Sequence, residues 1–428
     1  MIVEFSVKNF RSIKDLQTIS FATTGLKSAE KYTTIDRDNI VRDGNTELFK
    51  TVGIYGANAS GKSNIIKALD YFIAVVSSQP SAQSNLGSLC QPFLYNSDDE
   101  SKESFFQMIF IINETKYRYG LTVLKNQITD SISAPANNEV IANEWLFANR
   151  VKNMTTLFQR VGNELEKNNL NNKSNIPEVI PYEHTLFLTH AAAFDNSGDC
   201  KIITDYFRTL VQSNFSVDHE KFRWISLFYI EPRVGELNKE ALLKLLSIFN
   251  MKYEDIELED RANYKQHDLF PQEKIVMIKH LRINGKTSKI KLNLKYNESA
   301  GSQKMFDLVG LLLAAFNYNR ALFIILDEID SNFHPSLLIK LIRLFNDPKM
   351  NKSNSQLLFT SHDTNLMSPS IMRRDQFYFT EKNEDESTRL YSLADLKGIK
   401  NDADFAKQYL AGYYGALPIL GQYAKKQS

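Results

Sequence analysis

One segment, GANASGKS at 56–63, constrains the fold of this chain more than any other part of the sequence. It follows a short β-branched run, TVGIY at 51–55, and precedes a stretch over 62–76 whose apolar residues recur with helical period. This strand–loop–helix context is what the G-x-x-x-x-G-K-[ST] pattern requires. Glycines let consecutive N–H groups turn toward phosphate oxygens, and the helix N-terminus adds its positive dipole. The complete context argues against a chance glycine-rich turn.

The segment predicts a phosphate-binding loop with assigned roles. We expect the Lys62 ammonium to reach the β- and γ-phosphates of a nucleotide and the Ser63 hydroxyl to bind Mg²⁺. The expected nucleotide-binding residues are Gly56, Asn58, Ala59, Ser60, Gly61, Lys62, Ser63 and Asn64.

A second segment, ALFIILDE at 321–328, reads as an apolar strand that ends in two carboxylates. A buried parallel strand delivers the residues at its carboxyl end to the ligand edge of the sheet. We expect Asp327 to hold Mg²⁺, through water or Ser63, and Glu328 to polarise the attacking water as a general base. A strand that ends in two acids is often only a strand that meets solvent, but its pairing with the phosphate loop favours the catalytic interpretation.

Two more segments flank this acidic strand. ESAGSQKMF at 298–306 opens a helix with one apolar face, where Ser299 or Ser302 could serve simply as the N-cap. Beyond the acidic strand, QLLFTSHDTNL places His362 directly after another apolar strand. A lone histidine at a strand end is more often structural, but the ordered features before it favour a contact with the γ-phosphate.

The order of these segments resembles that of ABC-type ATPase heads. More narrowly, it is similar to the SMC-like, OLD-related ATPases of bacterial defence, above all the RloA-type group with the ATPase subunits of abortive-infection and PARIS-type systems. The resemblance rests on NFRSIKD, GANASGKSN, ESAGSQKMF, ILDEIDSNFHPSLL and FTSHDTNL, and YLAGYYGALPIL at 409–420 resembles a terminal motif of that group.

The resemblance implies ATP and Mg²⁺ as cofactors and adds roles for further residues. Ser299 and Gly301 would approach the γ-phosphate bound on the opposite protomer, and Arg11 would reach the nucleotide site. A surface arginine after a strand is nearly as good an interpretation of Arg11. The glutamine that couples such heads to their insertion stays unassigned between Gln91 and Gln107.

The expected fold is α/β: an ABC-type P-loop NTPase head whose mixed sheet carries an antiparallel N-terminal meander, split by a mixed α/β insertion without a long coiled coil. Residues 1–160 would form the first half of the head with the strand meander. Residues 161–270 would form a largely helical insertion, and 271–428 the second half with the signature, acidic strand and histidine.

Each motif occurs once, so one chain cannot complete an ABC-type site and a homodimer through ATP-sandwiched heads, with higher oligomers open, is expected. About 65 residues follow His362, too few for the Toprim nuclease domain of OLD proteins. We therefore expect a separate effector, an RloB-like or Toprim-type nuclease, and an ATP-driven switch in anti-phage defence. The alternative is an SMC-like DNA-repair or DNA-bridging ATPase; a transporter ATPase ranks third.

Composition bounds the remaining possibilities. The chain has 51 Lys and Arg against 50 Asp and Glu, which disfavours a strongly cationic nucleic-acid binder and leaves room for a local DNA contact. Cys90 and Cys200 lie far apart, so neither a disulfide framework nor a zinc site is expected. The longest apolar run, 309–316, is far shorter than a membrane span, and no signal peptide is evident. We expect a cytoplasmic protein without a membrane partner.

Overall fold

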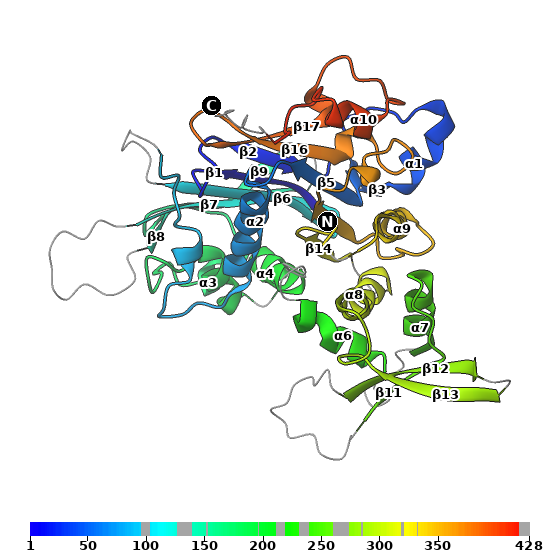
Figure 1. Cartoon of the computed structure of the whole chain (residues 1–428). Helices are drawn as coiled ribbons and strands as arrows, with labels where there is room; N and C mark the ends of the chain where they lie inside the picture. Colours follow the sequence, from blue (N-terminus) through cyan, green and yellow to red (C-terminus); the bar gives the residue numbers. More distant parts are fainter. Residues whose placement is uncertain are drawn as a thin grey trace, which may run out of the picture.

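The computed structural model describes residues 1–95, 103–125, 139–150, 153–195, 197–210, 219–230, 239–259, 274–283, 286–317, 321–331 and 333–418. Within these residues the chain is a mixed α/β fold with several sheets, which confirms the predicted α/β class. Figure 1 shows the two largest sheets in the upper part of the molecule and a small sheet beside α7 at the other end.

The largest sheet is antiparallel, with seven strands in the order β10-β9-β8-β7-β6-β1-β2. Its strands are β1 Ile2–Lys8, β2 Gln17–Ser20, β6 Ser104–Ile112, β7 Thr115–Lys125, β8 Glu139–Asn149, β9 Met154–Val161 and β10 Glu164–Asn168. The predicted strand meander over 104–160 is therefore present. Alternation of buried and partly exposed residues along these strands fixes which face carries the core.

The second sheet draws strands from both ends of the chain. It has five strands in the order β14-β15-β5-β16-β17. They are β5 Thr51–Gly56, β14 Phe323–Leu326, β15 Gln356–Thr360, β16 Phe377–Lys382 and β17 Thr388–Ser392. The first four run parallel, and β17 pairs antiparallel with β16. The carboxyl ends of β5, β14 and β15 therefore meet at one edge of the sheet.

This five-stranded sheet is buried on both faces, which explains its continuous apolar runs. Ile54, Ile325 and Leu358 point into one core, which they share with α2 and the seven-stranded sheet. Their sequence neighbours, among them Tyr55 and Phe359, point into a second core shared with α8 and α9. The strand before the phosphate loop, β5, therefore packs between two hydrophobic cores.

Helices divide between these two layers. The first layer contains α2 Lys62–Ser77, α3 Phe187–Phe194 and α4 Asp199–Thr209; the second contains α6 Arg223–Phe228, α7 Lys239–Ile248, α8 Ala300–Asn317 and α9 Pro335–Asn346. The longest helix in the described ranges is α8, so no long coiled coil occurs in them. No described helix combines the length and apolarity needed to cross a membrane.

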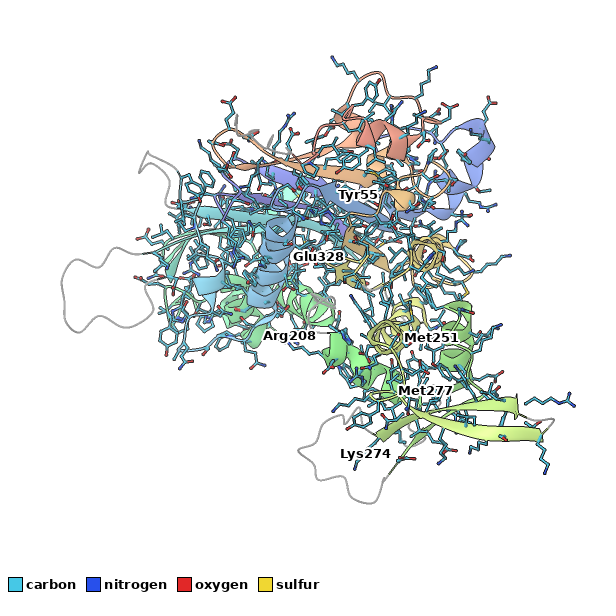
Figure 2. All side chains as sticks on the ribbon, viewed as in Figure 1. Tyr55, Arg208, Met251, Lys274, Met277 and Glu328 are labelled. Atoms are coloured by element: carbon cyan, nitrogen blue, oxygen red, sulfur yellow. The ribbon has the colours of Figure 1, made fainter. Side chains whose placement is uncertain are left out.

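A smaller sheet packs against the second layer. It consists of β11 Asp255–Leu258, β12 Ile275–Ile283 and β13 Lys286–Asn293. Met251 and Met277 join it to the second core, at the end of the molecule away from Glu328 (Figure 2). The remaining elements are α1 Thr33–Asp38, β3 Ile40–Asp43, β4 Thr46–Phe49 and α10 Phe405–Leu410. The boundary expected at 270 lies outside the described residues, and the predicted division into 1–160, 161–270 and 271–428 stays a prediction.

Candidate functional site

The phosphate loop leaves β5 at Gly56 and enters α2 at Lys62, as the sequence predicts. Gly61 is the N-cap of α2 and has φ +106°, in the left-handed region that favours glycine. A Cβ at Gly61 would lie 2.0 Å from the Thr388 Oγ1 atom, so β17 presses directly on the loop. The Thr388 hydroxyl also donates to the backbone carbonyl of Ser60 at 3.1 Å. The loop is therefore braced from behind by a strand more than 300 residues later in the sequence.

Lys62 lies folded back over this loop. Its Nζ donates to the backbone carbonyls of Gly56 at 2.8 Å and Ala57 at 3.0 Å. Burial lowers the pKa of Lys62 to about 8, although the nearby Asp327 and Glu328 act in the opposite direction. The ammonium thus lies against the loop that the sequence predicts to bind phosphate.

The pKa of Lys62 predicts a pH dependence of nucleotide binding. Only the protonated amine attracts phosphate, so affinity should be full below pH 8. Above pH 8 the Lys62 amine of the free protein is neutral and must take up a proton before it attracts phosphate. The Kd should therefore rise by about tenfold per pH unit, until the pH reaches the higher pKa of Lys62 in the nucleotide complex. Titration of a fluorescent ATP analogue between pH 7 and 9.5 measures this, with Lys62→Arg as a control that stays charged. A Kd that is flat for the native chain over this range would contradict the assignment.

The acidic pair follows β14, and one hydroxyl fixes both of its members. The Thr360 side chain, at the end of β15, donates to Asp327 Oδ1 at 2.5 Å and accepts from the backbone N–H of Glu328 at 2.7 Å. Asp327 is buried, whereas Glu328 is exposed. Glu328 has φ +51°, a left-handed conformation that is rare for a non-glycine residue. Strained backbone of this kind is found mostly at functional sites, where many surrounding contacts hold it in place.

His362 lies on the same edge, two residues beyond Thr360. Its backbone N–H is 3.3 Å from both carboxylate oxygens of Asp330. Burial, followed by the charge of Lys62, lowers the pKa of His362. At neutral pH the imidazole is therefore uncharged and can offer one N–H donor and one acceptor.

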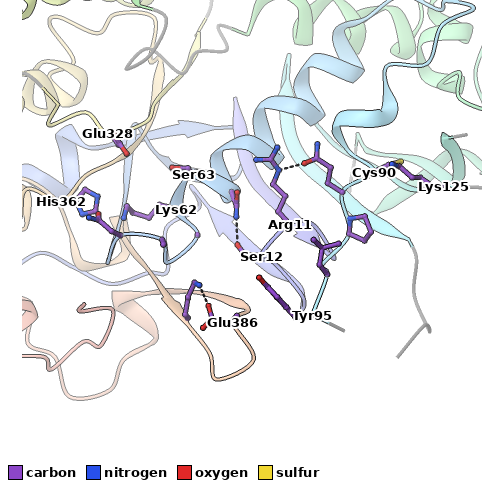
Figure 3. Close-up of a pocket in the computed structure, with 18 residues that line it drawn as sticks. Arg11, Ser12, Lys62, Ser63, Cys90, Tyr95, Lys125, Glu328, His362 and Glu386 are labelled. Carbon is purple, nitrogen blue, oxygen red and sulfur yellow. Dashed lines mark hydrogen bonds and ion pairs between the residues drawn. The ribbon is translucent and has the colours of Figure 1, made fainter. Parts of the chain in front are cut away.

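A pocket of about 760 Å³ collects most of the predicted site residues. The predicted residues that line it are Arg11, Asn58, Ala59, Gly61, Lys62, Ser63, Asn64, Glu328 and His362. Lys62, Ser63, Glu328 and His362 lie toward one end, and Arg11, Tyr95 and Lys125 toward the other (Figure 3). Gly56, Ser60 and Asp327 do not line the pocket; the loop glycine and serine lie behind it, where the Ser60 hydroxyl is 2.6 Å from that of Thr380.

Arg11 reaches the pocket in an unusual backbone conformation, with φ +50°. Its Nε donates to Gln91 Oε1 at 2.7 Å, and its guanidinium lies over the Tyr71 ring. Gln91 itself lines the pocket, whereas the other candidate glutamine, Gln107, accepts from the Trp145 indole in the seven-stranded sheet. The structure thus places Gln91 at the pocket and Gln107 away from it, a distinction that the sequence does not make.

Ser299 and Gly301 do not line this pocket. Ser299 is exposed before α8, and its hydroxyl accepts from the backbone N–H of Ser302 at 3.1 Å, so it caps the helix as the simpler interpretation expects. Further along the same helix, the Lys304 ammonium donates to the Ser331 hydroxyl at 2.6 Å. The helix that carries the signature-like segment is therefore tied to the loop after the acidic strand.

The residues present fit a Mg²⁺–nucleotide complex. The cradle at Gly61 excludes even a Cβ, Ser63 faces the pocket, and Asp327 keeps Oδ2 without a hydrogen bond in the described part of the chain. A Mg²⁺ ion held by a hydroxyl, a carboxylate, water and substrate phosphates needs no dense ligand cluster. Among the described residues, no group of three or more His, Cys, Asp or Glu side chains is placed to hold a metal ion by itself.

Several residues at the site carry no sequence signal of their own. Ser12 accepts from Asn64 Nδ2 at 2.7 Å and lies 2.7 Å from the Thr388 hydroxyl, which joins the N-terminal loop to the phosphate loop. Thr360 ends the apolar strand β15 and Thr388 begins the more polar strand β17, and only the sheet order brings them to the site. The serine after Arg11, in the NFRSIKD motif, was the one available hint.

Comparison with known proteins agrees with this geometry. A family described as "AAA domain, putative AbiEii toxin, Type IV TA system" matches residues 52–368. The matched range contains the phosphate loop, the acidic strand and His362, and leaves out Arg11 and the terminal motif. No curated protein matches the chain.

Proposed function

The chain belongs to the AAA-domain family described as putative AbiEii toxins of type IV toxin–antitoxin systems, and from that premise we propose that it is an ATP-driven switch in bacterial anti-phage defence. One observation carries the proposal: three segments distant in sequence bring Lys62, Ser63, Glu328 and His362 into one pocket. These are the residue types that phosphoryl transfer to water requires. The toxin–antitoxin wording of the family supports a defence role.

The proposed reaction is hydrolysis of ATP to ADP and phosphate. Lys62 and the N–H groups of the loop hold the β- and γ-phosphates, while Ser63 and Asp327 would hold Mg²⁺, which would neutralise phosphate charge. Glu328 accepts a proton from the water whose oxygen attacks the γ-phosphorus, and the bond to the β–γ bridging oxygen breaks. The Thr360 hydroxyl positions Glu328 and Asp327, and neutral His362 donates to a γ-phosphate oxygen.

We further propose that the active form is a homodimer with ABC-type heads. Ser299 and Gly301 lie outside the pocket of their own chain, which fits a role at the pocket of a second copy. The Lys304–Ser331 contact then links the signature of one site to the acidic strand of the other. ATP closes the dimer and hydrolysis opens it, which controls a separate cytoplasmic effector, a nuclease of the RloB-like or Toprim type.

Mixing two inactive variants tests the shared site. Lys62→Ala removes the phosphate contact in its own pocket, and Ser299→Arg obstructs the pocket of the partner. Half of the dimers formed from an equal mixture contain both chains, and one of their two sites is intact, so hydrolysis should recover to about one quarter of the native rate.

The matched control mixes Lys62→Ala with Glu328→Gln. Both changes act in the pocket of their own chain, so no mixed dimer has an intact site and no rate should return. Phosphate release after co-expression or subunit exchange measures both mixtures. Equal rates in the two mixtures would refute the shared site, whereas native rates in the single variants would refute the pocket itself.

A further inference from the structure

The outer face of the seven-stranded sheet carries a row of flat side chains. Along β6, β7 and β8 every second residue is buried on the side of α2, α3 and α4, through ring contacts such as Phe72 with Phe106 and Phe110 with Phe207. The alternate residues point the other way and stay partly exposed. We call four of them the aromatic platform: Phe105, Arg118, Trp145 and Phe147. Figure 1 shows the three helices together on the opposite side of this sheet.

Trp145 lies flat across the sheet. It is directly opposite Gly120 in the β7–β8 register, and a Cβ at Gly120 would lie 2.5 Å from its ring. The indole Nε1 reaches over β7 to donate to Gln107 on β6 at 3.3 Å. One ring face therefore rests on the backbone of Gly120, and the side chain stays partly exposed. The Phe105 ring stacks against the indole, with its centroid 5.5 Å away and its plane within 28° of the indole plane.

Arg118 forms a second flat surface beside the indole. It is opposite Phe147 in the same register, and its guanidinium carbon lies 4.4 Å from the centre of the Phe147 ring. The Nε atom is buried without a hydrogen-bond partner, and within the described residues the guanidinium makes no ion pair. A cation held without a carboxylate on an aromatic ring is a ready partner for an anion or a polarisable ring.

The surroundings of the platform are weakly basic. Lys8 is exposed on β1 opposite Phe105, and Lys116 lies on the same face of β7 as Arg118. Acidic residues on this face include Glu4, whose pKa is raised by burial and lowered by Lys116, and Glu103, whose carboxylate accepts from the Asn143 amide at 3.5 Å. Lys8, Lys116 and Arg118 outnumber Glu4 and Glu103 around the rings, although the chain as a whole is nearly neutral.

We propose that this face binds single-stranded nucleic acid, with bases stacked on Trp145 and on the Arg118–Phe147 pair and the backbone beside Lys8 and Lys116. Antiparallel sheets that present aromatic rings on neighbouring central strands bind unpaired bases in this way. The partly exposed rings favour planar bases over a protein partner, whose side chains would need pockets rather than a flat surface. The site is separate from the phosphate-loop pocket and goes beyond the ATPase proposal.

The two tryptophans of the chain provide a direct probe. Trp224→Phe leaves Trp145 as the sole tryptophan, so a stacked base should quench its fluorescence. Titration of this variant, as the full chain, with an unlabelled thymidine 20-mer should show saturable quenching. With the platform and rim cations of Lys8, Lys116 and Arg118, the salt slope for a single strand should be shallow, about −2.

Binding should depend on the platform and not on the nucleotide pocket. With a fluorescein-labelled 20-mer read by anisotropy, Trp145→Ala and Arg118→Ala should each weaken the Kd by about tenfold or more. Trp145→Phe should retain most of the affinity, which separates stacking from misfolding. Trp224→Ala, an equivalent change of a partly exposed tryptophan on α6, and Lys62→Ala should each leave the Kd unchanged.

Three results would overturn the inference. They are absence of quenching in the Trp224→Phe chain at 100 mM salt, equal Kd values for Trp145→Ala and Trp224→Ala, or binding of a blunt duplex of the same length as tightly as the single strand. The third would mean that charge alone governs binding. The Lys62→Ala chain separates these outcomes from failure of the ATPase proposal. This change removes the expected nucleotide contact and leaves the aromatic platform intact, so its Kd for the 20-mer reports on the platform alone.

Discussion

Replacing Glu328 with Gln should slow ATP hydrolysis by about 10²–10⁴-fold, the usual contribution of a positioned general base. The amide keeps the shape of the side chain, and the Thr360 hydroxyl still accepts from the backbone N–H of residue 328. Phosphate contacts at Lys62 are untouched, so ATP should bind at least as tightly as in the native chain. Under the dimer proposal, ATP-bound dimers should accumulate because they no longer open by hydrolysis.

Phosphate release, titration with a fluorescent ATP analogue and light scattering measure these three quantities. Glu114→Gln is the matched control, because Glu114 is another exposed glutamate with positive φ, +66°, in the turn between β6 and β7. It should hydrolyse ATP at the native rate. A Glu328→Gln chain that retains the native rate would exclude Glu328 as the base, and one that stays monomeric with saturating ATP would reject the dimer clamp.

Replacing Gly61 with Ala should abolish nucleotide binding, with the Kd raised by about 100-fold or more. The new Cβ would lie 2.0 Å from Thr388 Oγ1 and would force a side chain into φ +106°. Backbone strain of this kind costs about 1–3 kcal/mol, and the overlap with a buried strand adds to it. The loop must move to relieve it, which displaces the N–H groups that surround the phosphates.

Gly44→Ala is the matched control. It measures the loss of stability from a side chain at positive φ without the clash that a side chain at position 61 makes with Thr388. Gly44 has φ +57° in the turn between β3 and β4, and a Cβ there meets nothing within 4 Å. It should lose about 1 kcal/mol of stability and keep native ATP affinity. Thermal unfolding monitored by circular dichroism shows whether the Gly61→Ala chain is still folded; a folded variant with native affinity would mean that phosphate does not occupy this loop.

Local chemistry made much of the site predictable. The phosphate loop, the acidic pair and His362 each follow an apolar strand, and the carboxyl ends of parallel strands meet at one sheet edge. The sequence could not rank Gln91 above Gln107, because neither lies in the sequence context expected of such a glutamine. Their separation depends on where the segment after α2 crosses Arg11, a contact between residues 80 positions apart.

By itself, the sequence predicts a phosphate-binding loop, because a backbone rich in glycine can turn its N–H groups inward before a helix. It also determined the α/β class, because apolar strands alternate with helical segments. Only the tertiary structure shows which neutral side chains contact the phosphate loop and the acidic pair. Thr388 braces the loop and Thr360 holds both acids, because sheet order, which no local pattern encodes, sets β15 beside β14 and β17 within reach of the loop.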